Sequence, residues 1–541
     1  MIMMAWFSAS SLATAFVLVL TVLAVSLRIF RKQQNDDLKD IVTVGINLAS
    51  NENNIISWTL AILRSLTSTS EWAHDGYRRF SKAPIQRAFA LPSMWTGSVM
   101  VVLPPSLLES VLNRPEAELA AHRAQLDSIQ LPYMLSDPDV YDNPIQFDVV
   151  RRNMSRQNVR SLAGLTAAAL HDAFTACWVG PDKKDNNSWT TLNNWDACGK
   201  IFTRVTMLSL VGPTLSRDEQ LLDWVRKFAS SVITGTAFVN SLPPGWIRSS
   251  LGPLFGIQAK FYQYRCLKIM VPVIQERMRK RQDGARRHVD DDFIESTISR
   301  CARTGDPTQM DPQRIALRLL GLASMSIMGM VYVFTHCIAD VYGSPRNKRD
   351  EFLAALEAEC NQQAQTDDNA KSFHLESTLN ESMRLNNISV TSLARDVVVD
   401  SLHIPISDKP SAGHGYRLPR GTRVVFPTQD MHRDESVFGP KADEFDALRF
   451  SRESRGEGGR TDDMRKNLLF FGYGKHGCPG RHYAMEILKQ ALSYVVLNYD
   501  VQLVETAADD DGAGFKKETK KTLLNVNVPN VDQKIRVRRK M

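Results

Sequence analysis

The sequence predicts a mainly α-helical protein with small β-sheets, preceded by one N-terminal transmembrane helix. Three observations support this fold class. The first 27 residues carry no charged side chain, many later segments have apolar residues at helical spacing, and only short segments alternate as strands do. With 43% hydrophobic and 23% charged residues in a chain of 541, the composition is ordinary for a globular protein with a large core.

The N-terminus predicts a membrane anchor at residues 1–32. Residues 13–27 form a strongly apolar run, and Arg28, Arg31 and Lys32 follow it. The uncharged segment is long enough to span a bilayer, whereas a cleaved signal peptide would carry its basic residues before a shorter apolar core. Because the basic residues follow the run, residues 33–541 are expected on the cytoplasmic side.

The next part of the chain alternates between helices and a hairpin. Residues 71–82 have helical composition. The alternation within residues 88–103 predicts a β-hairpin that ends at two prolines, and residues 106–112 predict a helix. Residues 161–300 hold several amphipathic helices broken by loops.

Residues 311–342 predict one long helix. The stretch 319–335 carries no charged residue, and Gly343 and Pro345 follow as a helix end. Its 17 positions reach the lower limit for a membrane span. We expect a long buried helix instead, because Arg318 and His336 directly flank the uncharged stretch.

Residues 372–426 predict a helix followed by strands. The helix begins near Ser372 and carries Glu381 and Arg384, whose three-residue step puts the carboxylate and the guanidinium on one face. Alternating β-branched residues in 386–400 suggest strands, and residues 416–426 predict a hairpin with Pro-Arg-Gly at its turn.

Cys478 lies in the most distinctive stretch of the chain, residues 471–480. Four glycines and a proline exclude a helix or strand interior and predict a tight loop. Residues 481–492 have helical spacing, so Cys478 stands just before a helix N-terminus. The helix dipole and the loop N–H groups favour the thiolate form, which a haem iron needs as its axial ligand. The alternative is an inert, buried cysteine in a turn.

The cysteine pattern and the net charge limit the compartment and the partners that the protein is expected to have. The seven cysteines show no CxxC or other zinc-like spacing, and an odd number leaves one thiol over after any full pairing. Both features favour a reducing compartment with one functional thiolate. The net charge of +7 suits a cytoplasmic membrane face or an acidic redox partner, and it is too weak to predict nucleic-acid binding.

The spacing Phe471-x-x-Gly474-x-His476-x-Cys478-x-Gly480 resembles the haem-binding signature of the cytochrome P-450 superfamily. The resemblance covers roughly residues 70–540. It implies the cytochrome P-450 fold, with residues 33–541 as a single haem-thiolate catalytic domain. It also implies haem b (iron protoporphyrin IX) as the cofactor, with the cysteine as axial ligand of the iron and the other motif residues around the haem.

The same resemblance assigns a structural cluster. Glu381 and Arg384 match the family's ExxR pair, which members close with an arginine from an Arg-Phe element, here Arg449. One carboxylate between two planar guanidinium groups can accept several charge-assisted hydrogen bonds. These three residues are therefore expected to hold the haem-binding core and not to act in the chemistry.

Basic residues are expected at the haem propionates. By position, His476 and Arg395 resemble propionate-binding residues of the family, with an exposed strand charge as the alternative for Arg395. A helix across residues 147–160 would supply another cation, although the Trp that usually precedes it by four residues is absent. The candidates share a helix face, the sequence does not choose among them, and a solvated face is the alternative for each: Arg152, Arg156 and Arg160.

The long helix at 311–342 departs from the family's pattern. Members usually carry an acid followed by Thr, a pair that relays protons to the reacting oxygen, and the corresponding positions are Met328 and Gly329. Ser324 and Ser326 are the nearby hydroxyls. They are either a substitute proton relay or small core residues that bond back to their own helix.

The resemblance implies a membrane-anchored monooxygenase that oxidises a hydrophobic small molecule. The layout is similar to that of filamentous-fungal members, which commonly oxidise terpenoid or polyketide intermediates of secondary metabolism. Electrons would come from NADPH through a separate cytochrome reductase, since no nucleotide-binding unit is recognised in the chain, and Lys475 is a candidate contact for it. Eukaryotic members of this kind face the cytosol from the endoplasmic reticulum membrane.

Two alternative functions stay open from the sequence. The missing acid–Thr pair favours an isomerase, a dehydratase or a rearrangement enzyme on the same fold, without net oxygen insertion. A haem sensor or binding protein without catalysis is the other. In each case residues 388–393 and 523–528 would line the ligand pocket by their position in the family.

Overall fold

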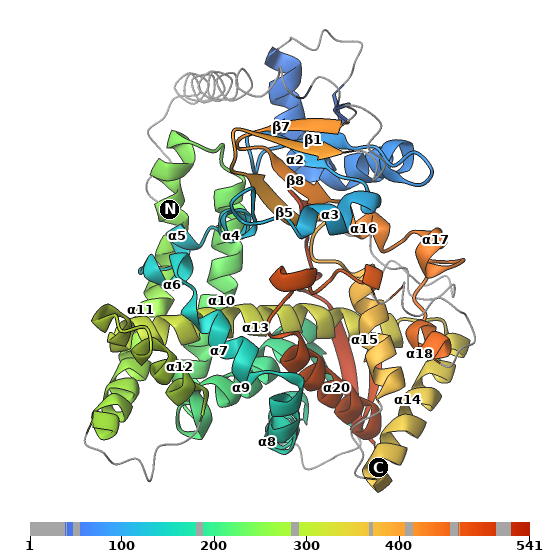
Figure 1. The fold of residues 1–541 in the computed structure, drawn as a ribbon. Coiled ribbons are helices and arrows are strands. Elements are labelled where there is room, and N and C mark those ends of the chain that lie inside the picture. Colours follow the sequence, from blue (N-terminus) through green and yellow to red (C-terminus); the bar gives the residue numbers. More distant parts are fainter. Residues whose placement is uncertain are drawn as a thin grey trace, which may run out of the picture.

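The computed structural model has the mainly helical architecture with small sheets that the sequence predicts (Figure 1). It describes residues 38, 41–46, 55–179, 188–282, 292–366, 372–405, 415–454, 464, 466–504 and 521–540. The predicted anchor at residues 1–32 lies outside the described residues, so it stays a prediction.

Helices account for most of the described chain. In the first half they are α2 (Ile55–Gly76), α3 (Leu108–Leu112), α4 (Ala121–Ile129), α5 (Leu131–Met134), α6 (Asp139–Asp142), α7 (Ile145–Asn153), α8 (Arg156–Phe174), α9 (Asn194–Leu215), α10 (Glu219–Asn240) and α11 (Trp246–Gln282). In the second half they are α12 (Phe293–Ala302), α13 (Pro312–Tyr342), α14 (Arg346–Thr366), α15 (Phe373–Leu385), α16 (Thr428–Met431), α17 (Glu435–Phe438), α18 (Arg449–Ser454) and α20 (Arg481–Asn498).

The strands of the described chain form four small sheets. Their bounds are β1 (Phe89–Ser93), β2 (Ser98–Val102), β3 (Leu119–Ala120), β4 (Thr190–Asn193), β5 (Ser392–Val397), β6 (Ser401–Pro405), β7 (Gly415–Pro419), β8 (Arg423–Phe426), β9 (Tyr499–Leu503), β10 (Thr522–Leu523), β11 (Val526–Asn527) and β12 (Lys534–Arg539). The largest sheet has the order β1-β2-β8-β5-β3, and only its β2–β8 pair is parallel. The other sheets are β4-β12-β9, β6-β7 and β10-β11.

The long helix α13 runs through the middle of the molecule, between the largest sheet and the helices on its other side (Figure 1). Asp311 caps it by accepting a hydrogen bond from the Gln313 N–H, and the helix ends at Gly343, so the predicted bounds are confirmed. Most of its side chains are buried. Although α13 is long and apolar enough to cross a membrane, it forms the buried helix that we expected from residues 319–335.

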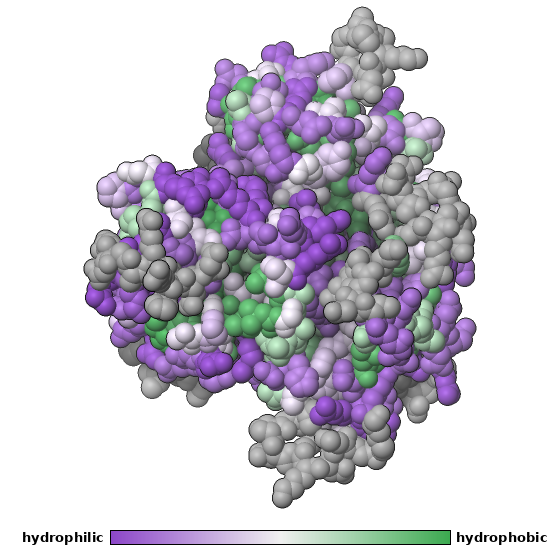
Figure 2. All heavy atoms as spheres, turned by 60° about the horizontal axis from the view of Figure 1, so that its bottom comes forward, coloured by the Kyte–Doolittle hydropathy of each residue, from purple (hydrophilic) through white to green (hydrophobic). Residues whose placement is uncertain are grey.

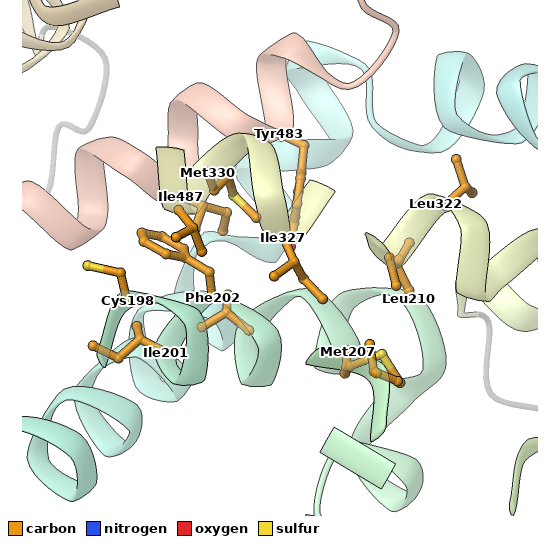
Figure 3. Close-up of a cluster of buried hydrophobic side chains, with 14 of the residues drawn as sticks. Cys198, Ile201, Phe202, Met207, Leu210, Leu322, Ile327, Met330, Tyr483 and Ile487 are labelled. Atoms are coloured by element: carbon orange, nitrogen blue, oxygen red, sulfur yellow. The ribbon is translucent and has the colours of Figure 1, made fainter. Parts of the chain in front are cut away.

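The core around α13 is shared with α9 and α20. Figure 3 shows Phe202 of α9, Met330 of α13 and Ile487 of α20 in one cluster of buried side chains. Tyr483 of α20 reaches α9, where its hydroxyl donates a hydrogen bond to Ser209 Oγ at 2.9 Å. This packing fixes α20, the helix that follows the cysteine loop, against α13.

The surface carries apolar side chains in addition to the expected polar ones. The face in Figure 2 is mainly hydrophilic, and hydrophobic side chains gather near its centre. Among the described residues, α10 and α11 carry several large exposed apolar side chains, including Phe238, Trp246, Leu254 and Phe261. Large exposed apolar side chains that gather on neighbouring helices are typical of contact with a membrane or another protein.

The hairpin predicted at residues 416–426 is wrong. Strands β7 and β8 do form there, but β7 pairs with β6, whereas β8 pairs with β2 and β5 in the largest sheet. Gly421 at the turn has a φ of +84°, and its N–H donates to Val397 O at 2.8 Å. The glycine therefore directs the chain from one sheet into another, which local alternation cannot reveal.

Two predicted helices have other bounds. The helix expected at residues 71–82 is the end of α2, which runs from Ile55 to Gly76, followed by a π-helical turn at Tyr77–Ser81. The helix expected across residues 147–160 is two helices, α7 and α8, because the Ser155 side chain accepts a hydrogen bond from the Asn158 N–H and caps a new helix. The basic residues expected on one face of a single helix are therefore divided between α7 and α8.

Candidate active site

Residues 471–480 form a tight loop around Cys478. The Cys478 N–H donates a hydrogen bond to Phe471 O at 2.7 Å, which closes the loop. Gly472 and Gly474 have φ values of +82° and +59°, a backbone region that other residues rarely adopt. A Cβ atom on Gly472 would also lie 3.4 Å from backbone atoms across the loop. The closed shape therefore requires glycine.

Cys478 is half-buried and lies just before α20, whose N-cap is Gly480. Burial raises the pKa of the Cys478 thiol, while the N–H groups of Gly480 and Arg481 act in the opposite direction. The loop N–H groups before the helix therefore act in the predicted direction, and burial opposes them. A coordinating metal would act in the same direction as these N–H groups, because a metal deprotonates the thiol that coordinates it. All seven cysteines of the chain are free thiols.

Cys478 lines a cavity that α13 also borders. The residues of α13 in the lining include Ser326, Gly329, Met330 and Val333. A Cβ atom added at Gly329 would meet nothing within 4 Å, so α13 leaves open space beside the cavity. Most of the other lining side chains are apolar. The cavity is therefore suited to an apolar group that lies next to the Cys478 sulfur.

The two serines of α13 have different surroundings. Ser324 Oγ donates to Gly321 O at 2.9 Å, a bond back to its own helix, and Ser324 does not line the Cys478 cavity. Ser326 does line it, and its hydroxyl makes no hydrogen bond to any residue that the structure describes. Of the two hydroxyls, that of Ser326 is the one free to act at the cavity.

Glu381, Arg384 and Arg449 meet in a buried cluster. The Glu381 carboxylate accepts hydrogen bonds from Arg384 Nε and Nη2, each at 2.8 Å, and from Arg449 Nε at 3.0 Å. The side chains of Glu381 and Arg384 are 0% exposed, and that of Arg449 is 11% exposed. Removing one partner of such a cluster would cost roughly 3–5 kcal/mol, because it strands a buried charge.

His432 connects this cluster to the cysteine loop, and our sequence reasoning did not identify it. Its backbone carbonyl accepts a hydrogen bond from Arg384 Nη1, and its Nε2 accepts one from the Leu469 N–H at 2.9 Å. Leu469 O in turn accepts from the Gly472 N–H at 2.9 Å. Burial, together with the Arg384 charge, lowers the pKa of His432 to about 3, so its ring is neutral and Nε2 can accept. No spacing signal in the sequence could have assigned this role.

Arg395 and His476 form a basic pair beside the loop. Arg395 is 3% exposed, so the exposed-strand alternative is wrong, and it donates to Ala394 O at 2.9 Å. Within the described chain it forms no ion pair, and burial lowers its pKa. Burial also lowers the pKa of His476, and Arg395 acts in the same direction. Glu116, 3.1 Å from His476 Nε2, is the carboxylate beside them. Two basic groups that repel one another suit an anionic ligand.

The structure does not bring the three arginines expected from residues 147–160 to this basic pair. All three are exposed on α7 and α8: Arg152, Arg156 and Arg160. Arg151, which sequence reasoning missed, instead lies close enough to His476 to act on its pKa. The signal was present in the sequence, because Phe147 precedes Arg151 by four residues, as the family's Trp precedes its arginine. Phe147 also lines the Cys478 cavity.

The two segments expected in the ligand pocket lie side by side. The Val390 N–H donates to Asn525 O at 2.9 Å, which joins residues 388–393 to residues 523–528. Neither segment contributes to the lining of the Cys478 cavity.

Comparisons with known proteins agree with this arrangement. The sequence profile of the family described as Cytochrome P450 matches residues 182–526. The chain is 31% identical to cytochrome P450 monooxygenase htyF of Aspergillus rugulosus, over 83% of this chain and 67% of the relative. It is 28% identical to cytochrome P450 monooxygenase gloP of Glarea lozoyensis, over 89% and 88%. It is also 26% identical to cytochrome P450 monooxygenase okaG of Penicillium ochrochloron, over 82% and 86%.

Replacing His432 with Phe is expected to loosen the cysteine loop. The ring volume is nearly kept, but the Leu469 N–H loses its acceptor, and stranding a buried donor costs about 1–3 kcal/mol. Hydrogen exchange followed by mass spectrometry should show faster exchange across residues 469–478 than in the wild type.

His403→Phe, at an exposed position of β6, is the matched control and should leave that segment unchanged. If the two variants exchange equally across residues 469–478, the loop does not depend on His432.

Proposed function

Because the chain belongs to the cytochrome P450 family of monooxygenases, we propose that it is a membrane-anchored haem-thiolate monooxygenase that oxidises a hydrophobic small molecule. One observation carries this proposal. The Cys478 loop opens onto a mainly apolar cavity that α13 borders, so a thiolate and an apolar ligand can meet there.

The residues around the cavity fit haem b. Cys478 would be the axial ligand of its iron, and Phe471, Gly474 and Gly480 would keep the loop closed around the sulfur. Bound haem supplies the activation of dioxygen, and a thiolate ligand favours cleavage of the O–O bond. The apolar lining excludes water from the reacting centre, which protects it from side reactions.

The buried basic pair would hold the anionic edge of the haem. Arg395 is buried without a carboxylate partner in the described part of the chain, and His476 lies near it. Propionate groups would supply the negative charge that Arg395 lacks. Arg151 is a further candidate at the same edge, because it acts on the pKa of His476.

Glu381, Arg384 and Arg449 are proposed to position the loop and to take no part in the chemistry. Their cluster lies in the interior, and the structure joins it to the loop through His432 and Leu469. Its role would be to keep the Cys478 sulfur at one place relative to α13.

Proton delivery is proposed to differ from the family's usual route. Met328 and Gly329 stand at the usual acid and Thr positions, and neither side chain can carry a proton. Ser326 Oγ faces the same cavity as Cys478 without a hydrogen-bond partner in the described chain. It would donate and accept a proton there, together with water or a substrate hydroxyl. Ser324, bonded to Gly321 O, would be a packing residue.

The proposed membrane attachment has two supports. Residues 1–32 have the composition of a single-pass anchor for the endoplasmic reticulum membrane with the domain in the cytosol. Exposed apolar side chains of α10 and α11, such as Trp246 and Leu254, would add an interfacial contact. We propose NADPH–cytochrome reductase as the electron donor, with Lys475 as one contact on the protein surface.

The proposed substrates are hydrophobic intermediates of fungal secondary metabolism, such as terpenoids or polyketides. The apolar lining of the cavity and the similarity to fungal monooxygenases support this class. The isomerase or dehydratase alternative depended on the missing acid–Thr pair, and the relatives reported above do not support it, because they are named monooxygenases.

The ligand assignment predicts that Cys478→Ala abolishes the thiolate-type absorption of the reduced carbon monoxide complex, since none of the other six cysteines lines the Cys478 cavity. Cys177→Ala, which removes a half-buried cysteine elsewhere, should leave that spectrum intact. A Cys478→Ala spectrum identical to that of the wild type would contradict both the ligand assignment and the proposed function.

The proton-relay assignment predicts that Ser326→Ala uncouples NADPH oxidation from product formation. With a substrate chosen by binding spectra from a terpenoid and polyketide panel, product per NADPH should fall at least about tenfold while hydrogen peroxide rises. Ser324→Ala is the matched control and should keep wild-type coupling. Equal coupling in both variants would make Ser326 a packing residue.

A further inference from the structure

A second cavity lies beside the cavity of Cys478. The linings of the two cavities share Phe147, Leu322 and Met325, so the cavities are neighbours along α13. Cys478 lines the first cavity and not the second. The second cavity is lined mainly by apolar side chains from several elements, among them Leu126, Leu131, Leu135, Val140, Phe228 and Val232.

His122 brings a polar group to this apolar cavity. It is the second residue of α4, and its side chain lines the second cavity and not the first. Its Nε2 atom is buried and has no hydrogen-bond partner among the described residues. Buried ring nitrogens are normally paired, because an unpaired one loses its hydration without compensation. An unpaired nitrogen at a ligand cavity is therefore available to a ligand atom.

Two other polar side chains of the second cavity are already engaged. Ser324 Oγ donates to Gly321 O at 2.9 Å. The Gln146 amide donates to Val140 O at 2.8 Å, and its oxygen accepts a hydrogen bond from Arg318 Nη1 at 2.6 Å. Breaking either arrangement to bind a ligand would strand a buried partner. His122 can bind a ligand without that loss.

We propose that His122 Nε2 forms a hydrogen bond with an oxygen atom of the substrate, either a hydroxyl or a carbonyl oxygen. This inference rests on the proposed function and names its substrate class: a hydrophobic molecule with a polar oxygen remote from the carbon that is oxidised. A neutral imidazole serves both oxygen types, because Nε2 accepts from a hydroxyl in one tautomer and donates to a carbonyl in the other.

The arrangement also determines which carbon is presented for oxidation. An oxygen bound at His122 lies in the second cavity, which Cys478 does not line and which meets the Cys478 cavity at Phe147, Leu322 and Met325. The part of the substrate nearest Cys478 is then apolar. Loss of the His122 hydrogen bond should weaken orientation as well as affinity, whereas loss of an apolar contact should weaken affinity for every ligand alike.

Three cage molecules with one carbon skeleton test this inference: bornane without oxygen, borneol with a hydroxyl and camphor with a carbonyl. Binding to the haem-loaded full-length chain is measured by equilibrium dialysis and by the shift of the main haem absorption band. The wild type should bind borneol and camphor more tightly than bornane. His122→Phe should weaken binding of the two oxygenated probes about tenfold, which is the effect of one buried hydrogen bond, and leave bornane unchanged.

Three further variants separate this role from packing. His122→Gln keeps a hydrogen-bonding group and should retain part of the preference for the oxygenated probes. Leu126→Ala enlarges the same cavity and should weaken all three probes alike. Tyr141→Phe removes another hydroxyl from the lining and should keep the wild-type preference.

The inference is overturned if the wild type does not prefer the oxygenated probes, or if folded His122→Phe keeps the wild-type preference. A chain that binds no haem, or lacks the thiolate-type carbon monoxide spectrum, contradicts the proposed function as well. The haem spectrum of each preparation therefore distinguishes the two failures.

Discussion

The buried cluster of Glu381, Arg384 and Arg449 is the interaction on which the rest of the site depends. A carboxylate that is 0% exposed needs its cationic partners, since a stranded charge in the interior costs several kcal/mol. Both guanidinium groups also donate hydrogen bonds to backbone carbonyls of residues 432–444. The cluster thereby fixes the polypeptide that His432 joins to the cysteine loop.

Helix α13 is the second constraint, because it borders the cavity that Cys478 lines. Its apolar side chains pack against α9 and α20 in one core, so the loop at the start of α20 and the middle of α13 are held relative to one another (Figure 3). Gly329 leaves space beside Cys478, and Ser326 provides a hydroxyl there. The same helix extends along the second cavity, where His122 Nε2 has no hydrogen-bond partner in the described chain. Helix α13 thus borders both the Cys478 cavity and the second cavity, where His122 is proposed to bind the substrate oxygen.

Local chemistry explains which elements the sequence predicts well. The bounds of α13 follow from the Asp311 cap and from Gly343. The closed loop around Cys478 follows from its glycines, two of which adopt positive φ values. Residues 416–426 were misread because alternation identifies a strand and not its partner. The helix at residues 147–160 was misread because the Ser155 cap was overlooked.

Some site residues can likewise be identified from their spacing in the sequence, and others cannot. Cys478, Glu381 and Arg384 stand in spacings that carry meaning by themselves, and Arg151 stands in a spacing that we failed to use. His432 and His122 have no such spacing. Their roles depend on the Leu469 N–H and on a cavity formed by residues from three parts of the chain, 122–147, 228–232 and 321–325, and these contacts exist only after folding.

Iron K-edge X-ray absorption of the ferric, haem-loaded full-length protein tests the central claim most directly. If the cluster and α13 hold Cys478 at the haem as we propose, the iron has one sulfur neighbour in addition to its porphyrin nitrogens. A spectrum that fits only nitrogen and oxygen neighbours would contradict the account, because the loop would then present its sulfur to something other than the iron.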